Sequence, residues 1–154
     1  MKLFVYGTLM RGMPFPMAAF LEEHAEFVCD GWLNGRLYEL GGYPGLVIFP
    51  EGGSNRVTGH VFEMADSDVV LTKLDAYEMI DPVEPEKSEY LRVQMPVNTG
   101  LGILDCAVYV YNQSVEGLTE IPEGDWRAWF YSRESPVDPG RFRVGVFEKG
   151  KGNT

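Results

Sequence analysis

The alternation of apolar and polar residues along the chain predicts six short strands. Runs rich in β-branched and aromatic residues recur over the first three quarters of the sequence, and glycines and prolines separate them. The expected strands are Leu3–Tyr6, Phe27–Leu40, Leu46–Phe49, Val57–Met64, Tyr90–Val97 and Ile103–Tyr111. The turn Asn98-Thr99-Gly100 indicates a hairpin between the last two. Strands at this short spacing favour a closed or nearly closed antiparallel sheet.

Three other segments have helical character. The first is Pro14–Ala25, with Pro16 placed in its first turn. Asp66 is a typical N-cap for a second helix that runs to about Tyr77. A third, weaker helix is expected over Asp125–Ser132, and the chain shows no internal repeat and no domain linker.

The charge balance bears on the choice of partner. Thirteen Lys and Arg residues stand against 23 Asp and Glu residues, which gives a formal net charge of −10. Such a surface repels a phosphate backbone and no basic run offsets it, so we do not expect nucleic acid as a partner. With 154 residues, 45% of them hydrophobic, the chain fits one domain with a sizeable core.

Cys29 and Cys106 are the two cysteines of the sequence. Two distant thiols cannot form a metal cluster, and a small secreted scaffold usually carries more cysteines, so we expect free, buried or half-buried thiols. The N-terminus enters a strand without a signal-peptide pattern, and no apolar run approaches the ~20 residues of a membrane span. We therefore expect a cytoplasmic protein that makes no membrane contact.

Glu78 occupies an unexpected position in the second predicted helix. At 100° per residue, four apolar residues of this helix fall within one arc of about 120°: Val70, Leu71, Leu74 and Tyr77. Glu78 falls inside the same arc, so its carboxylate is expected to point at the core. Burial raises the pKa of a carboxyl group, which suits a general acid/base near neutral pH. The alternative is that the helix ends at Tyr77 and leaves Glu78 in an exposed acidic loop.

The turn Tyr6-Gly7-Thr8-Leu9 is a second candidate site. Glycine lets the backbone approach a ligand closely, and successive N–H groups leaving the turn can form a nest for a carboxylate. The glycine spacing matches neither the P-loop nor the dinucleotide-binding pattern, so nucleotide binding gains no support. Tyr43 could line the mouth of a pocket. Arg11, Arg36 and Arg92 are candidate carboxylate clamps, although each fits a surface ion pair equally well.

Five segments of the chain, taken in order, resemble the γ-glutamylcyclotransferase-like, or AIG2-like, family. They are FVYGTLMRG, GRLYELGGYPGLV, LDAYE after a helix, EYLRVQMPV and AVYVYNQ. The opening YGTLMRG is most similar to the bacterial branch that acts on γ-glutamylamines. The resemblance implies an α+β fold with a small mixed, largely antiparallel β-barrel, a few flanking helices and a cavity at one end. The domain would span 1–134 and leave 135–154 as a loosely ordered C-terminal extension.

The resemblance also implies a site and a reaction. The family's acid/base glutamate, in its Asp-x-Tyr-Glu segment, matches Glu78, and the family's turn that binds the γ-glutamyl group matches the turn after the first strand. The substrate-binding residues expected are Tyr6, Gly7, Thr8 and Leu9, with Tyr43 and Tyr111 as further candidates. In the implied reaction the substrate's α-amino group attacks its own γ-carbonyl and releases 5-oxoproline and an amine. No metal or organic cofactor is expected.

Other functions remain open at this point. A chain that kept the pocket without the chemistry would be a non-catalytic binding module for a small metabolite. A related possibility is an enzyme that removes a γ-glutamyl protecting group from a pathway intermediate. His24 and His60 are not expected to be catalytic bases, because His24 lies in an acidic helical segment and His60 lies in the middle of a strand. A serine hydrolase is not expected either, because the sequence has no Gly-x-Ser-x-Gly elbow. The leaving amine and the oligomeric state are not specified by the sequence.

Overall fold

The computed structural model describes residues 1–49 and 55–132 of the chain. The strands of this part are β1 (Lys2–Val5), β2 (Ala25–Asn34), β3 (Arg36–Glu39), β4 (Pro44–Val47), β5 (Arg56–Met64), β6 (Tyr90–Thr99), β7 (Gly102–Tyr111) and β8 (Glu120–Ile121). The helices are α1 (Pro16–His24), α2 (Ser67–Tyr77), the 3₁₀ turn η1 (Pro85–Lys87) and α3 (Trp126–Tyr131). All three predicted helices are confirmed. The predicted C-terminal extension, 135–154, lies outside the described residues.

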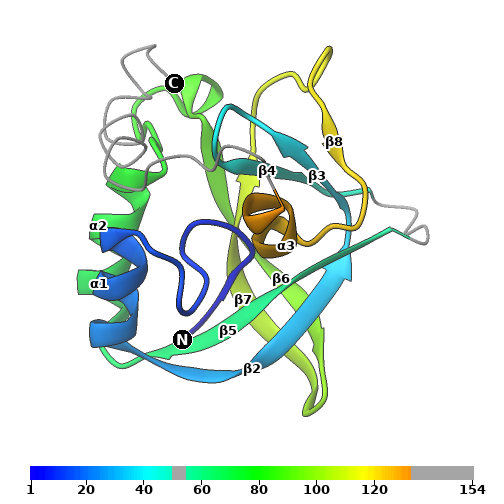
Figure 1. Ribbon diagram of the computed structural model, residues 1–154. Coiled ribbons are helices and arrows are strands. Elements are labelled where there is room, and N and C mark those ends of the chain that lie inside the picture. Colours follow the sequence, from blue (N-terminus) through cyan, green and yellow to red (C-terminus); the bar gives the residue numbers. More distant parts are fainter. Residues whose placement is uncertain (50–54, 133–154) are drawn as a thin grey trace.

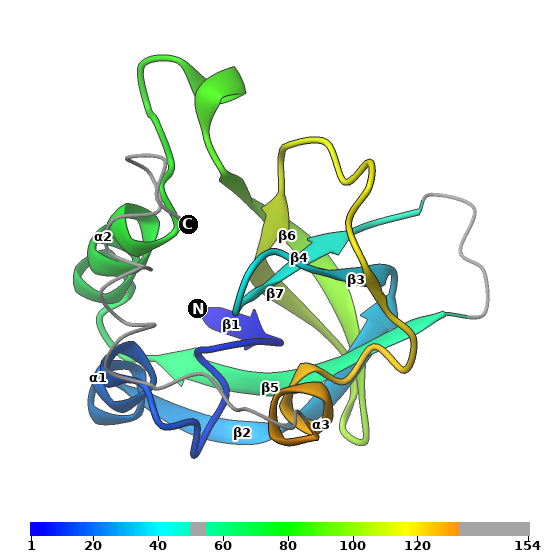
Figure 2. The same cartoon turned by 45° about the horizontal axis from the view of Figure 1, so that its top comes forward.

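A closed barrel forms the centre of the fold (Figure 1). Within the described residues its five strands follow the order β1-β5-β2-β6-β7. β1 closes the barrel because it pairs antiparallel with β5 and parallel with β7, whereas the other pairs are antiparallel. Helices α1 and α2 lie side by side next to the barrel, and α3 lies beside β5 and β2 (Figure 2). This arrangement confirms the predicted α+β fold with a small mixed, largely antiparallel barrel and a few flanking helices.

The prediction that all strands belong to one sheet was wrong. In the described part of the chain, β3, β4 and β8 form a second, three-stranded sheet in the order β4-β3-β8. The strand expected over 27–40 therefore divides at Gly35, between β2 and β3. A Cβ atom at this position would lie 2.8 Å from the Val47 carbonyl oxygen, so glycine lets the chain pass close to β4 where it leaves the barrel.

Both cysteines are free thiols, as the sequence predicted. Cys106 is buried in the core, and this burial raises the pKa of its thiol to about 11. Cys29 is half-buried on β2. Among the described helices, none is long and apolar enough to cross a membrane.

The barrel depends on one close approach between neighbouring strands. Gly59 of β5 faces β1, and a Cβ atom there would lie 2.1 Å from the Val5 carbonyl oxygen and 2.9 Å from the Phe4 ring. The backbone, unlike a side-chain end, cannot move aside locally. The absent side chain therefore sets how tightly β1 closes the barrel.

We expect Gly59→Ala to lower the free energy of unfolding by about 2–3 kcal/mol, because β1 must shift away from β5. Gly100→Ala is the matched control, since no described heavy atom lies within 4 Å of a Cβ there, and its effect should stay within about 0.5 kcal/mol. Urea unfolding of both variants measures the difference. Equal losses in the two variants would contradict the role given to the β1–β5 approach.

Candidate active site

A narrow cavity lies where the turn after β1, the start of β4, the end of α2 and strands β6 and β7 meet. Its volume is about 30 Å³, enough for roughly two water molecules. It is lined by Phe4, Val5, Tyr6, Gly7, Thr8, Leu9, Tyr43, Pro44, Glu78, Tyr90 and Tyr109. Six of the seven site residues named from the sequence line this one cavity. Their roles in binding and catalysis stay predictions.

The structure decides between the two expectations for Glu78. Helix α2 ends at Tyr77, as the alternative supposed, yet Glu78 is only 8% exposed and lines the cavity. Its N–H still donates to the Leu74 carbonyl at 2.8 Å, so the side chain continues the helical arc. The four residues predicted to form the apolar stripe are all buried: Val70, Leu71, Leu74 and Tyr77. The inward-facing carboxylate predicted from helical geometry is therefore confirmed.

The end of α2 is closed by a paired hydrogen-bond cap directly after Glu78. The Ile80 N–H donates to the Asp75 carbonyl at 3.1 Å, and the Met79 N–H donates to the Ala76 carbonyl at 3.2 Å. Met79 has φ 59°, a left-handed conformation that glycine usually occupies and that costs a non-glycine residue about 1 kcal/mol. This strained residue fixes the direction in which the chain leaves the helix immediately after the carboxylate.

Asp75 ties the same helix to the barrel wall. Its carboxylate accepts two bonds from Arg92 of β6, from Nε at 2.9 Å and from the terminal Nη2 at 3.1 Å. It also accepts a bond from the Tyr109 hydroxyl of β7 at 2.6 Å. A bidentate arginine pair with an added hydroxyl is a geometrically specific contact. The position of Glu78, three residues after Asp75 and directly after the end of α2, is therefore coupled to β6 and β7.

None of the three candidate arginine clamps lines the cavity. Arg92 is engaged by Asp75, and Arg36 lies 3.8 Å from the Glu120 carboxylate. The guanidinium of Arg11 lies 4.4 Å above the Phe27 ring. A substrate carboxylate in this cavity would therefore have to be held by main-chain N–H groups and hydroxyls.

The turn after β1 supplies such groups. The Met10 N–H donates to the Gly7 carbonyl at 3.0 Å and closes the turn, and the Thr8 hydroxyl lies 3.0 Å from the Tyr77 hydroxyl. The N–H groups of Thr8 and Leu9 donate to no acceptor among the described residues. Gly7 itself does not use a positive φ, contrary to the freedom expected from the sequence. Its role is spatial, because a Cβ atom there would lie 2.6 Å from the Pro44 ring.

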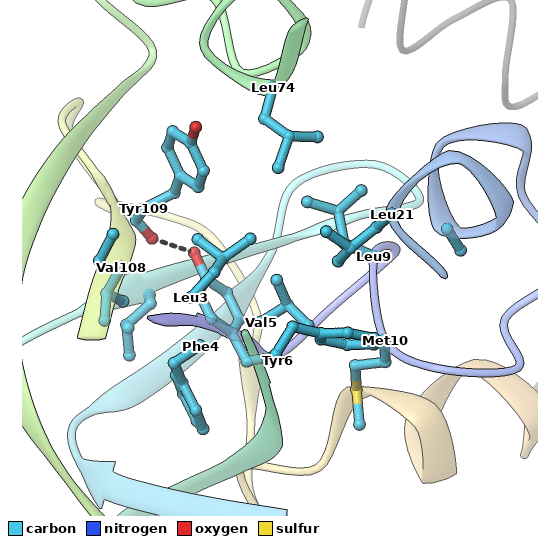
Figure 3. Packing of buried hydrophobic residues seen from close by; sticks show 14 of the residues in the cluster. Leu3, Phe4, Val5, Tyr6, Leu9, Met10, Leu21, Leu74, Val108 and Tyr109 are labelled. Atoms are coloured by element: carbon cyan, nitrogen blue, oxygen red, sulfur yellow. Dashed lines mark hydrogen bonds between the residues drawn. The ribbon is translucent and has the colours of Figure 1, made fainter. Parts of the chain in front are cut away.

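Tyrosine hydroxyls form much of the remaining polar wall. Tyr6 donates to the Tyr109 carbonyl at 2.6 Å (Figure 3), and Tyr90 donates to the Pro44 carbonyl at 2.6 Å. Tyr43 donates to the Glu89 carboxylate at 2.6 Å. Burial raises the pKa of Tyr6 and Tyr90 well above the ordinary range, and the negative charge of Glu78 adds to the rise. These two phenols therefore stay protonated and cannot serve as bases.

Tyr111 was assigned to this site from the sequence, but it does not line the cavity. Its ring packs edge-on against Tyr90, with 5.5 Å between ring centroids. Tyr109, two residues earlier on β7, takes the place in the wall that was expected for Tyr111. The period of two along a strand places both tyrosines on the same face, so alternation alone could not choose Tyr109 over Tyr111.

The cavity wall also contains Tyr90 and Pro44, which were not predicted from the sequence as site residues. Both lie in segments that carried the family resemblance. Neither His24 nor His60 lines this cavity. Over residues 1–49 and 55–132, no group of three or more His, Cys, Asp or Glu side chains could hold a metal ion.

The two neighbouring tyrosines of β7 give a paired test of the Asp75 contact. We expect Tyr109→Phe to lower the free energy of unfolding by about 1.5–3 kcal/mol, because it removes a hydrogen bond to a charged acceptor. Tyr111→Phe should change it by less than about 0.5 kcal/mol, since its hydroxyl bonds no acceptor in the described part of the chain. Urea unfolding would refute the assignment if Tyr111→Phe were the more damaging change.

Comparison with known proteins agrees with this geometry. The family described as "Gamma-glutamyl cyclotransferase, AIG2-like" matches residues 3–128. The γ-glutamylcyclotransferase family protein ytfP of Citrobacter rodentium (strain ICC168) is 34% identical over 130 residues, which cover 82% of this chain and 95% of that protein. The YtfP protein of Escherichia coli (strain K12) is 32% identical over 129 residues, covering 82% and 96%.

Solved structures show the same likeness. The solution structure of ytfP from Escherichia coli matches with a TM-score of 0.54 and 31% identity, over 82% of this chain and 96% of that one. The crystal structure of an AIG2-like protein from Mus musculus matches with a TM-score of 0.62 and 26% identity, over 80% and 87%. From the matched residues and these relatives, the chain belongs to the AIG2-like γ-glutamylcyclotransferase family.

Proposed function

We propose that this protein is a cofactor-independent γ-glutamylcyclotransferase-type enzyme that releases 5-oxoproline and an amine from a γ-glutamyl amine, amino acid or peptide. The observation that carries the proposal is Glu78, a carboxylate that is 8% exposed and that lines a cavity beside the Gly7-Thr8-Leu9 turn. Family membership supports the reaction class. The buried carboxylate supports a catalytic role over simple binding.

Glu78 is assigned the proton transfer by elimination among the lining residues. The described part of this wall contains no Lys, Arg, His, Asp or Cys, and the other ionisable groups are tyrosines. Burial raises the pKa of Tyr6, Tyr90 and Tyr109, so each phenol keeps its proton near neutral pH. Glu78 is therefore the lining group able to take up and return a proton there.

The same carboxylate suits the substrate's charge. The α-amino group of a γ-glutamyl compound is an ammonium near neutral pH, and an ammonium is attracted to a carboxylate in a desolvated site. The Thr8 and Leu9 N–H groups, which donate to no acceptor among the described residues, would donate to a substrate oxygen, as a main-chain nest does. Holding the substrate at both points bends it toward ring closure, which supplies the orientation part of the rate gain.

The proposed reaction is balanced within one substrate molecule. Glu78 takes a proton from the α-ammonium, and the freed nitrogen attacks the γ-carbonyl carbon to form the new C–N bond of a five-membered ring. Negative charge collects on the former carbonyl oxygen, where main-chain N–H donors stabilise it. The bond to the leaving nitrogen then breaks as Glu78 returns the proton to that nitrogen. Glu78, again a carboxylate, takes the second proton from the ring nitrogen and passes it to the departing amine, which leaves as an ammonium. The products are 5-oxoproline and an amine.

Glu78→Gln is the direct test of this mechanism. The change preserves shape and removes the proton carrier, so turnover should fall by about 10²- to 10⁴-fold while the unfolding midpoint stays close to that of the wild type. 5-Oxoproline release from a panel of γ-glutamyl amines, amino acids and peptides is the measurement. Glu26→Gln, the same chemical change at an exposed position of β2, is the control and should leave turnover unchanged.

Two outcomes would overturn the proposal in different ways. Turnover of Glu78→Gln at the wild-type rate would remove Glu78 from the chemistry. Binding of γ-glutamyl compounds without any product from the folded wild type would make the protein a binding module instead. Product confined to one elaborate substrate would identify removal of a γ-glutamyl protecting group.

A further inference from the structure

A second cleft lies on another side of the barrel, between strands β2 and β5, the hairpin of β6 and β7, and helix α3. Its volume is about 580 Å³, and none of its lining residues lines the first cavity. Figure 2 shows α3 beside β5 and β2, where this cleft is found. On β5, Val57 and Val61 are fully buried, so the alternate residues Thr58 and His60 face this cleft instead.

The hydrogen bonding of His60 fixes which ring nitrogen carries the proton. The Arg11 N–H donates to Nδ1 of His60 at 2.9 Å, so Nδ1 is an acceptor and has no proton. Burial lowers the pKa of His60, and the charge of Arg127 adds to this effect, so the ring is neutral near pH 7. The single proton of the neutral ring is therefore on Nε2.

This assignment leaves two donors facing each other. Nη2 of Arg127 lies 3.5 Å from Nε2 of His60, and neither atom can accept a hydrogen bond from the other. Nη2 also donates to the Arg11 carbonyl. Nε of Arg127 is buried and has no acceptor among the described residues. Buried N–H donors normally have an oxygen partner. His60 Nε2–H and Arg127 Nε–H therefore both call for an acceptor that the described part of the chain does not supply.

Among the described residues, Asp30 has a carboxylate close to this pair, but it does not accept a hydrogen bond from His60. Its Oδ1 lies 3.6 Å from Nε2 of His60, beyond hydrogen-bond distance, and its side chain is 86% exposed. Asp125, whose side chain accepts from the Ala128 N–H, also lines the cleft. The cleft thus places the Asp30 carboxylate within a few ångströms of His60 Nε2, one of the two donors.

We propose that this cleft binds a free α-amino acid, with the ligand carboxylate accepting from His60 Nε2–H and Arg127 and the ligand ammonium facing Asp30. The donor pair requires an oxygen anion, and Asp30 beside it repels a second negative charge while attracting a positive one. An α-amino acid carries its two charges close together, as the short distance between the Asp30 carboxylate and His60 Nε2 requires. A phosphate ion lacks the cation and meets both Asp30 and the net charge of −10.

The NMR signals of the His60 ring can report directly on binding in this cleft. The chain has two histidines, so the full-length His24→Gln variant leaves one imidazole, whose ring signals can be followed by NMR. Titration with L-alanine should shift these signals saturably, and acetate and inorganic phosphate should bind at least about tenfold more weakly. Adding Glu78→Gln should leave the titration unchanged, which separates this cleft from the proposed active site.

Two substitutions test the two halves of the proposed contact. Arg127→Met should weaken L-alanine binding at least about tenfold, whereas Arg36→Met, an equal change of charge on β3, should leave it within about twofold. Asp30→Asn, at an exposed position that should not disturb folding, should weaken L-alanine but not acetate. No saturable shift up to about 20 mM L-alanine would overturn the proposal, as would phosphate binding as tightly as L-alanine or unchanged L-alanine affinity in Asp30→Asn.

Discussion

The end of helix α2 is the constraint on which the site depends. Glu78 lies at the wall of the cavity, and burying a carboxylate there costs free energy that the rest of the structure must offset. Two devices fix its position. The paired cap around left-handed Met79 fixes the backbone after the carboxylate, and Asp75 joins the helix to β6 and β7 through Arg92 and Tyr109.

The barrel supplies the opposite wall by close backbone approach. Gly59 lets β1 close against β5, so the turn after β1 emerges at a defined place. Gly7 in that turn then packs against the Pro44 ring at the start of β4. The close contact between Gly7 and Pro44, both of which line the cavity, fits its small volume.

The features that the sequence predicted well are those set by local periodicity. The 3.6-residue period placed Glu78 on the buried face, and Asp66 is the N-cap of α2, accepting from the Val69 N–H at 3.3 Å. The features that it missed depend on contacts between distant segments. The separation of β3, β4 and β8 into a second sheet, the packing of Pro44 on Gly7 and the choice of Tyr109 over Tyr111 all depend on pairing or registry that no local pattern contains.

The central claim is that Glu78 faces the substrate's α-amino group while the turn after β1 holds a substrate oxygen. A crystal structure of Glu78→Gln with a γ-glutamyl compound bound measures this directly. The account predicts the α-nitrogen within about 2.6–3.2 Å of the residue 78 side chain and a ligand oxygen at the Thr8 or Leu9 N–H. A ligand bound elsewhere, or bound here with its α-nitrogen turned away from residue 78, would contradict it.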